Sequence, residues 1–192
     1  MLHVNQLIII GGPSCAGKST LIDKIRDGTF PDLSENIGIT FPSSWSYAKA
    51  NDFMELHEQV IERLVIHFDF YRQYQQKNEF NYLPELVNNS NSVIILTLDV
   101  SPEILIKRVE SRIYGTLKSL LGLGMNKRIS CLHFWRRTKL LLKKRKAYKE
   151  GHSMFLYEKW FLFYSQNKVK AHWILDSNDN ICELSRSVHE RI

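Results

Sequence analysis

The stretch from Leu7 to Ile22 has the sequence LIIIGGPSCAGKSTLI. Its first four residues are all apolar, which is typical of a strand buried on both faces of a parallel sheet. Two glycines and a proline follow, and Thr20-Leu21-Ile22 begins an apolar pattern with helical spacing. A strand, a glycine-rich turn and a helix N-terminus in this order suit an anion, because backbone N–H groups and the helix dipole meet there.

Within this stretch, residues Gly12 to Ser19 match the pattern G-x-x-x-x-G-K-[ST] at every required position. In such a loop Lys18 reaches the β- and γ-phosphates of a nucleoside triphosphate, and the Ser19 hydroxyl ligates Mg²⁺. The chain resembles the P-loop NTPases, and its length of 192 residues favours the small P-loop kinases. We therefore predict a site for ATP and Mg²⁺ made by Gly12, Pro13, Ser14, Cys15, Ala16, Gly17, Lys18, Ser19 and Thr20.

Composition bounds the class of protein. A hydrophobic content of 44% with 24% charged residues is ordinary for a globular chain. No stretch approaches the roughly twenty apolar residues of a membrane span, and we expect no signal peptide. The three cysteines, Cys15, Cys131 and Cys182, are scattered without metal-ligand spacing. Their odd number and spacing favour a reducing, cytoplasmic location.

Positive charge is concentrated in one segment. Lys107 to Lys149 contains 14 Lys and Arg residues and a single acid, Glu110, for a net charge of +13. The rest of the chain carries a net charge of −7, which together gives the total of +6. A polyanion is therefore the expected partner or neighbour of this segment.

Hydrophobic patterns predict alternating strands and helices. Apolar runs predict strands over 7–10, 37–41, 64–69, 92–98 and 171–175. Helical spacing predicts helices over 19–27, 47–63, 80–87, 102–114 (capped by Ser101), 133–168 (interrupted near Gly151) and 180–192. The glycines between Gly115 and Arg128 predict a mobile connection.

This alternation predicts an α/β fold, a parallel sheet with helices on both faces. The resemblance to P-loop kinases implies five strands in the order 2-3-1-4-5 and a basic helical lid rich in Arg and Lys. We expect a single domain over 1–192, with a core of 1–110 and 169–192 and the lid at about 111–150. Ligands of such sheets bind beyond the carboxyl ends of the strands.

Asp69 closes the strand predicted at 64–69, where P-loop NTPases place the acid that holds Mg²⁺. It could instead be the base that accepts a hydroxyl proton. The stretch Asp69-Phe70-Tyr71-Arg72 loosely resembles the Asp-Gly-Phe-Pro-Arg of nucleoside monophosphate kinases, without the Gly and Pro and with the arginine one residue early. That resemblance implies Arg72 as a ligand of the acceptor. A similar resemblance after the last strand implies that Ser177 and Asn178 contact the base.

The segment from Asp99 to Arg112 is similar to the one that leads into the lid of nucleotide kinases. Arg108 and Arg112 are four residues apart and would share one helix face. Positive charge delivered by a lid stabilises the transferring phosphoryl group. The resemblance implies Arg112 as the catalytic arginine, with Arg108, Arg136 and Arg137 as further substrate ligands.

These residues predict an ATP- and Mg²⁺-dependent kinase in which Lys18, Asp69 and Arg112 are catalytic. Its acceptor would be small and anionic, such as a nucleotide or a phosphorylated metabolite. The basic segment also fits an NTPase that binds nucleic acid, or a nucleotide-dependent switch without turnover. The helix over 139–149 could alternatively bind nucleic acid or an acidic membrane surface, but its leucines at 140, 141 and 142 form no sharp stripe, which argues against the membrane.

Overall fold

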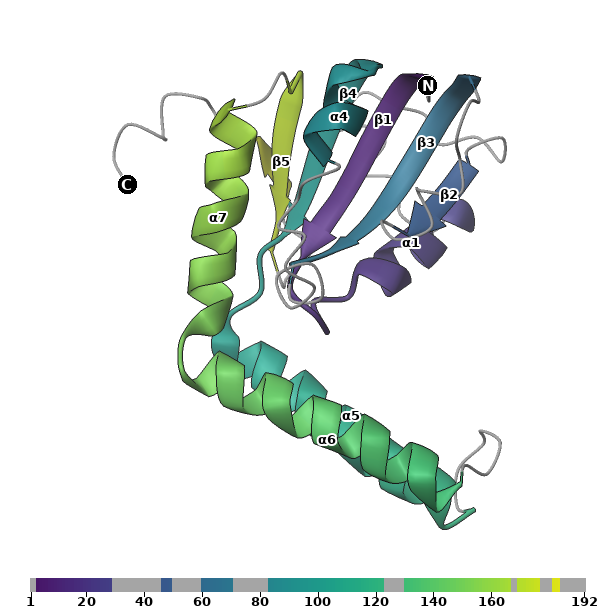
Figure 1. Ribbon diagram of the computed structural model, residues 1–192, viewed down its shortest axis with the longest axis vertical. Coiled ribbons are helices and arrows are strands. Elements are labelled where there is room, and N and C mark those ends of the chain that lie inside the picture. Colours follow the sequence, from purple (N-terminus) through teal and green to yellow (C-terminus); the bar gives the residue numbers. More distant parts are fainter. Residues whose placement is uncertain are drawn as a thin grey trace. The chain divides into compact units, whose positions relative to one another are not determined.

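The computed structural model describes residues 3–28, 46–49, 60–70, 83–122, 130–166, 169–176 and 181–183. The chain divides into two compact units, which are described separately below (Figure 1). The sheet unit comprises Met1–Asp99 and Leu156–Ile192, and the helical unit comprises Val100–Phe155. The helical unit contains the residues at which we expected a lid and extends beyond them on both sides.

The sheet has the strand order β2-β3-β1-β4-β5-β6 in the described part of the chain. Each neighbouring pair from β2 to β5 is parallel, so the predicted α/β class and the order 2-3-1-4-5 are confirmed. The sixth strand was not predicted and pairs antiparallel with β5. The strands are β1 (His3–Gly12), β2 (Ser46–Lys49), β3 (Val60–Asp69), β4 (Ser90–Leu98), β5 (Ala171–Leu175) and β6 (Ile181–Glu183).

The helix predicted over 47–63 is wrong where the structure describes it, because β2 and the first residues of β3 are extended. β3 pairs with β1 along its whole length, from Val60 opposite His3 to Asp69 opposite Gly12. The hydrogen bonds of this ladder outweigh the helical spacing of the local sequence. The strand predicted over 37–41 lies outside the described residues.

Successive residues of β3 show how helices cover the sheet. The Phe68 ring stacks on Trp160 of α7 (His152–Gln166), with the ring centroids 5.1 Å apart. The next residue, Asp69, faces Lys18 at the start of α1 (Lys18–Arg26). Because neighbouring strand residues point to opposite faces, α1 and α7 lie on opposite faces of the sheet. A short helix, α4 (Leu83–Asn88), precedes β4.

In the helical unit, α5 (Pro102–Leu120) and α6 (Cys131–Lys149) lie side by side as an antiparallel hairpin (Figure 1). The mobile connection predicted from Gly115 is wrong up to Leu120, because α5 continues through these residues. The buried hydroxyls of Thr116 and Ser119 donate to the carbonyl oxygens four residues earlier, so the helix itself satisfies them.

The break predicted near Gly151 is confirmed: α6 ends, Gly151 has a φ of 76°, and α7 begins at the next residue. The helix predicted over 180–192 is wrong at 181–183, which form β6, and its other residues lie outside the described ones. None of the helices in the described residues is long and apolar enough to cross a membrane.

Candidate functional site

The loop between β1 and α1 is built by backbone conformations that few residue types adopt. Gly17, the residue before α1, has a φ of 109°, and Cys15 has a φ of 73°, an uncommon value for a residue other than glycine. The N–H of Ala16 donates to the carbonyl oxygen of Pro13 at 3.2 Å, which closes a tight turn. The chain therefore reverses within a few residues and delivers Lys18 to the first position of the helix.

The Lys18 side chain is 3% exposed and lies over its own loop. Its ammonium donates to the carbonyl oxygens of Gly12 and Pro13, both at 2.7 Å. The same Nζ lies 3.7 Å from Oδ2 of Asp69, an ion pair beyond hydrogen-bond distance. A buried ammonium requires partners of this kind, because desolvation penalises an isolated charge.

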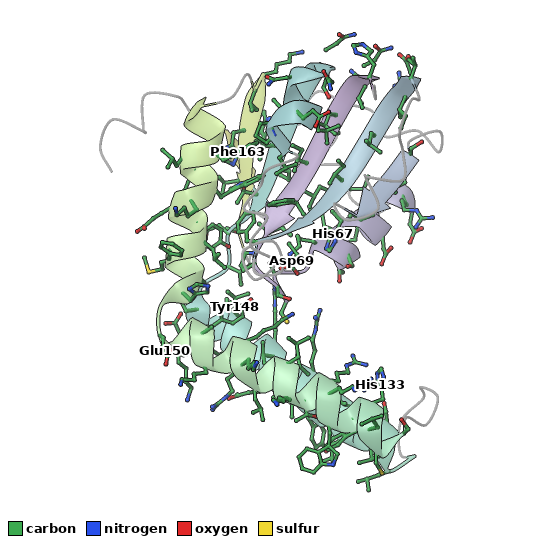
Figure 2. The ribbon with its side chains drawn as sticks, viewed as in Figure 1. His67, Asp69, His133, Tyr148, Glu150 and Phe163 are labelled. Carbon is green, nitrogen blue, oxygen red and sulfur yellow. The ribbon has the colours of Figure 1, made fainter. Side chains whose placement is uncertain are left out.

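Asp69 reaches this lysine because of the sheet register. It is the last residue of β3 and lies opposite Gly12, the last residue of β1. Parallel strands bring their carboxyl ends to one edge, and Figure 2 shows Asp69 at this edge of the sheet. Its carboxylate is 20% exposed, so it borders the loop while remaining open to solvent.

The remaining loop residues divide by exposure. Pro13, Ser14, Cys15 and Ala16 are buried, whereas Ser19 and Thr20 at the start of α1 are exposed. The hydroxyl of Ser19 and the carboxylate of Asp69 are hard oxygen donors of the type that Mg²⁺ prefers. Among the described residues, no group of three or more His, Cys, Asp or Glu side chains could hold a metal ion.

The carboxyl end of β4 also borders the loop. A Cβ on Gly12 would lie 3.3 Å from both Cβ and the carbonyl oxygen of Leu98, so glycine allows the loop to pass close to β4. Asp99 follows directly, and its N–H donates to the carbonyl oxygen of Leu175 at 2.8 Å. Although Asp99 is exposed at the surface, partial desolvation, followed by the nearby carboxylate of Asp176, raises its pKa above the ordinary value. Sequence reasoning assigned Asp99 no role, although an acid directly after a buried strand was the available signal.

Aromatic rings support the strand that leads into the loop. A Cβ on Gly11 would lie 2.9 Å from Cζ2 of Trp160 and 3.0 Å from Cε1 of Phe70. The Trp160 N–H donates to the Thr97 hydroxyl at 2.7 Å, and that hydroxyl lies 2.6 Å from Nε2 of His172. Trp160 of α7 is fully buried and thus packs the helix against the sheet at this point.

The arginines expected in the lid lie in the helical unit. Arg108 and Arg112 are both on α5, and Arg136 and Arg137 are both on α6. Arg108 is half-buried and the other three are exposed. Their approach to the phosphate loop stays a prediction. The expected ligands Arg72, Ser177 and Asn178 lie outside the described residues.

Comparison with known proteins adds no family to this geometry. A scan against protein-family models finds no match, and a search of curated proteins finds no significant relative.

Proposed function

We propose that this protein is an ATP- and Mg²⁺-dependent phosphotransferase that acts on a small anionic acceptor. The observation that carries the proposal is the juxtaposition of Lys18 and Asp69. A buried lysine in a G-x-x-x-x-G-K-[ST] loop lies 3.7 Å from an acid at the end of the neighbouring parallel strand. In P-loop enzymes these two groups serve the phosphates and the metal ion.

The chemistry of the loop fits this assignment. Lys18 has its donors directed at two loop carbonyl oxygens, which are neutral acceptors. Phosphate oxygens are stronger acceptors for an ammonium, because hydrogen bonds between ionised groups are about twice as strong as neutral ones. Lys18 would therefore hold the β- and γ-phosphates, and the loop carbonyl oxygens would keep its side chain close beforehand.

Ser19 and Asp69 would hold the metal ion, and the bound Mg²⁺ would supply charge neutralisation for the phosphates. Asp69 would in addition restrain Lys18, since the two side chains form an ion pair. The arginines Arg108, Arg112, Arg136 and Arg137 would add positive charge at the transferring phosphoryl group. The acceptor would be anionic, because these arginines belong to a segment with a net charge of +13.

The test is transfer of the label from γ-labelled ATP, with Mg²⁺, to pools of nucleosides, nucleotides, sugar phosphates and nucleic acids. We expect label on an organic product, and we expect Lys18→Ala to lower transfer by about 10²- to 10³-fold, as loss of a group that stabilises developing charge does. Lys24→Ala, on the same helix, is the matched control and should transfer label normally. Chelation of Mg²⁺ should abolish transfer.

Two results would contradict the kinase. Label released only as inorganic phosphate, and faster with nucleic acid, would favour the NTPase that binds nucleic acid. Tight ATP binding without any release would favour a nucleotide-dependent switch.

A further inference from the structure

The α5–α6 hairpin exposes several large apolar side chains. The buried side chains of its two helices are Leu105, Val109, Leu141 and Tyr148, together with the small polar residues Thr116, Ser119 and Thr138. Large apolar side chains remain exposed on the same two helices or just after α5, namely Tyr114, Leu117, Leu121, Leu132, Trp135, Leu140 and Leu142. Single exposed leucines are ordinary on protein surfaces, but a group of them on one hairpin marks an interaction surface.

One side of α6 combines these apolar groups with cations. A groove of about 580 Å³ runs along it, lined mainly by Trp135, Arg136, Lys139, Leu142, Lys143 and Lys146. These residues recur at helical spacing over three turns, so they share one side of the helix. We call this surface the basic apolar face. Trp135 is 68% exposed and Leu142 is 51% exposed, whereas Leu141 is buried in the hairpin.

The structure therefore revises the reading of the three consecutive leucines. Leu141 points into the hairpin, and only Leu142 lies on the basic apolar face. Adjacent leucines that form no apolar stripe in the sequence thus have different surroundings: Leu141 is buried and Leu142 is exposed on the face. The result is an apolar strip of Trp135 and Leu142 with four cations beside it.

We propose that the basic apolar face docks on an anionic phospholipid surface. Lys and Arg side chains pair with the phosphate groups of such a surface, while Trp and Leu enter the boundary between headgroups and acyl chains. The long stems of Lys139, Lys143 and Lys146 allow their ammonium groups to stay at the headgroups while the helix lies flat. This proposal goes beyond phosphotransfer and does not depend on it.

Charge and side-chain type select this partner. A second copy of the face would bring like charges together, since the segment over 107–149 carries +13. A nucleic acid would pair with the cations and stack on Trp135, but it would leave Leu142 without an apolar partner. A lipid surface satisfies both kinds of group at once.

Two interactions outside the basic apolar face stabilise the hairpin. Ser130 caps α6 by accepting from the N–H of His133, which Figure 2 labels near the N-terminal end of α6. Arg145 donates to Glu110 across the hairpin at 2.6 Å. Neither interaction involves the side chains of the face, so Trp135, Lys139, Leu142 and Lys143 can be replaced without removing either of them.

The test is co-sedimentation of the full chain with phosphatidylcholine vesicles, with or without about one third phosphatidylserine. We expect binding only to the anionic vesicles. Trp135→Ala with Leu142→Ala should lower the partition coefficient by at least tenfold, and Lys139→Gln with Lys143→Gln by about fivefold for each charge removed. Leu162→Ala with Lys170→Gln, at exposed positions of the sheet unit, should bind like the unchanged protein.

Tryptophan fluorescence distinguishes insertion of Trp135 into the lipid from adsorption by charge alone, because adsorption would leave the emission wavelength unchanged. The spectrum of the unchanged protein minus that of Trp135→Phe should shift to shorter wavelength on anionic vesicles, because the indole enters an apolar layer. Four outcomes would overturn the proposal: equal binding to neutral vesicles, unchanged binding of the face variants, sedimentation without vesicles, or tight binding of single-stranded RNA or DNA with none to vesicles.

Discussion

The sheet unit and the helical unit place charge and apolar surface in opposite ways. In the sheet unit a lysine is 3% exposed and is held by two carbonyl oxygens and an aspartate, while a tryptophan is fully buried. In the helical unit a tryptophan is 68% exposed, and the ion pair of Glu110 with Arg145 lies at the surface. The first arrangement fixes one side chain in one position, whereas the second leaves side chains available to a large partner.

This difference has an energetic basis. A buried charge must be matched by partners, so the geometry around Lys18 is strongly specified by the fold. Exposed apolar side chains contribute little to folding, but a group of them on one face marks a surface that contacts a partner. The sheet unit is therefore where we place chemistry, and the helical unit is where we place recognition of a surface.

The two tryptophans give the largest expected contrast. Trp160→Ala should destabilise the sheet unit by about 3–5 kcal/mol, because it removes a fully buried ring that packs on Phe68 and Phe70. Trp135→Ala should change stability by less than about 0.5 kcal/mol, as exposed substitutions usually do. Urea denaturation followed by circular dichroism measures both, and equal losses would contradict the comparison.

Gly11 in the sheet unit and Gly115 in the helical unit should respond in opposite ways to the addition of a single methyl group. Gly11→Ala should cost about 1–3 kcal/mol, since its Cβ would meet the rings of Trp160 and Phe70 at 2.9 and 3.0 Å. Gly115→Ala lies within α5 with nothing inside 4 Å of its Cβ, and should stabilise by about 0.5–1 kcal/mol. Thermal melts of both variants should move in opposite directions, and a stabilised Gly11→Ala would show that the rings are free to shift.

Much of the sheet could be predicted because its central strands are short, continuous apolar runs. Ile8 in β1 and Ile95 in β4 belong to short apolar runs of the length typical of a strand buried on both faces. The start of β3 could not be predicted this way, because Val60, Ile61 and Leu64 fit helical spacing as well as a strand. Its pairing with β1 is a long-range interaction that no local pattern contains.

The candidate site was predictable where one short motif contains it. Lys18 and Ser19 follow from the loop pattern, and Asp69 follows from its place at a strand end. The return of Lys18 to the carbonyl oxygens of Gly12 and Pro13 depends on the left-handed backbone at Cys15, which the sequence does not reveal. The proximity of Asp99 to Asp176 depends on the pairing of β4 with β5.

Asp99 gives a pH-dependent prediction for the edge of the sheet. Partial desolvation and Asp176 raise the pKa of Asp99 in the folded protein, so its ionisation at neutral pH weakens the folded state. Asp99→Asn should therefore raise the melting temperature at pH 7. The gain should shrink as pH falls through the raised pKa and vanish below the ordinary aspartate range, where the carboxyl is protonated in both states. Glu158→Gln, at an exposed position of α7, is the control, and a gain that persists at low pH would contradict this cause.

The smallest expected effect concerns the ion pair of the hairpin. Glu110→Gln removes the carboxylate that accepts from Arg145, but both side chains are more than one third exposed, at 46% and 35%. Solvent screens such a pair, so the loss in the free energy of unfolding should be about 0.2–1 kcal/mol and should diminish in 0.5 M salt.

The same substitution removes the single acid between Lys107 and Lys149, so it should also strengthen binding to anionic vesicles. Denaturation at two salt concentrations and vesicle binding separate the two effects, and a large, salt-independent loss of stability would mean that this pair resembles the buried one in the sheet unit.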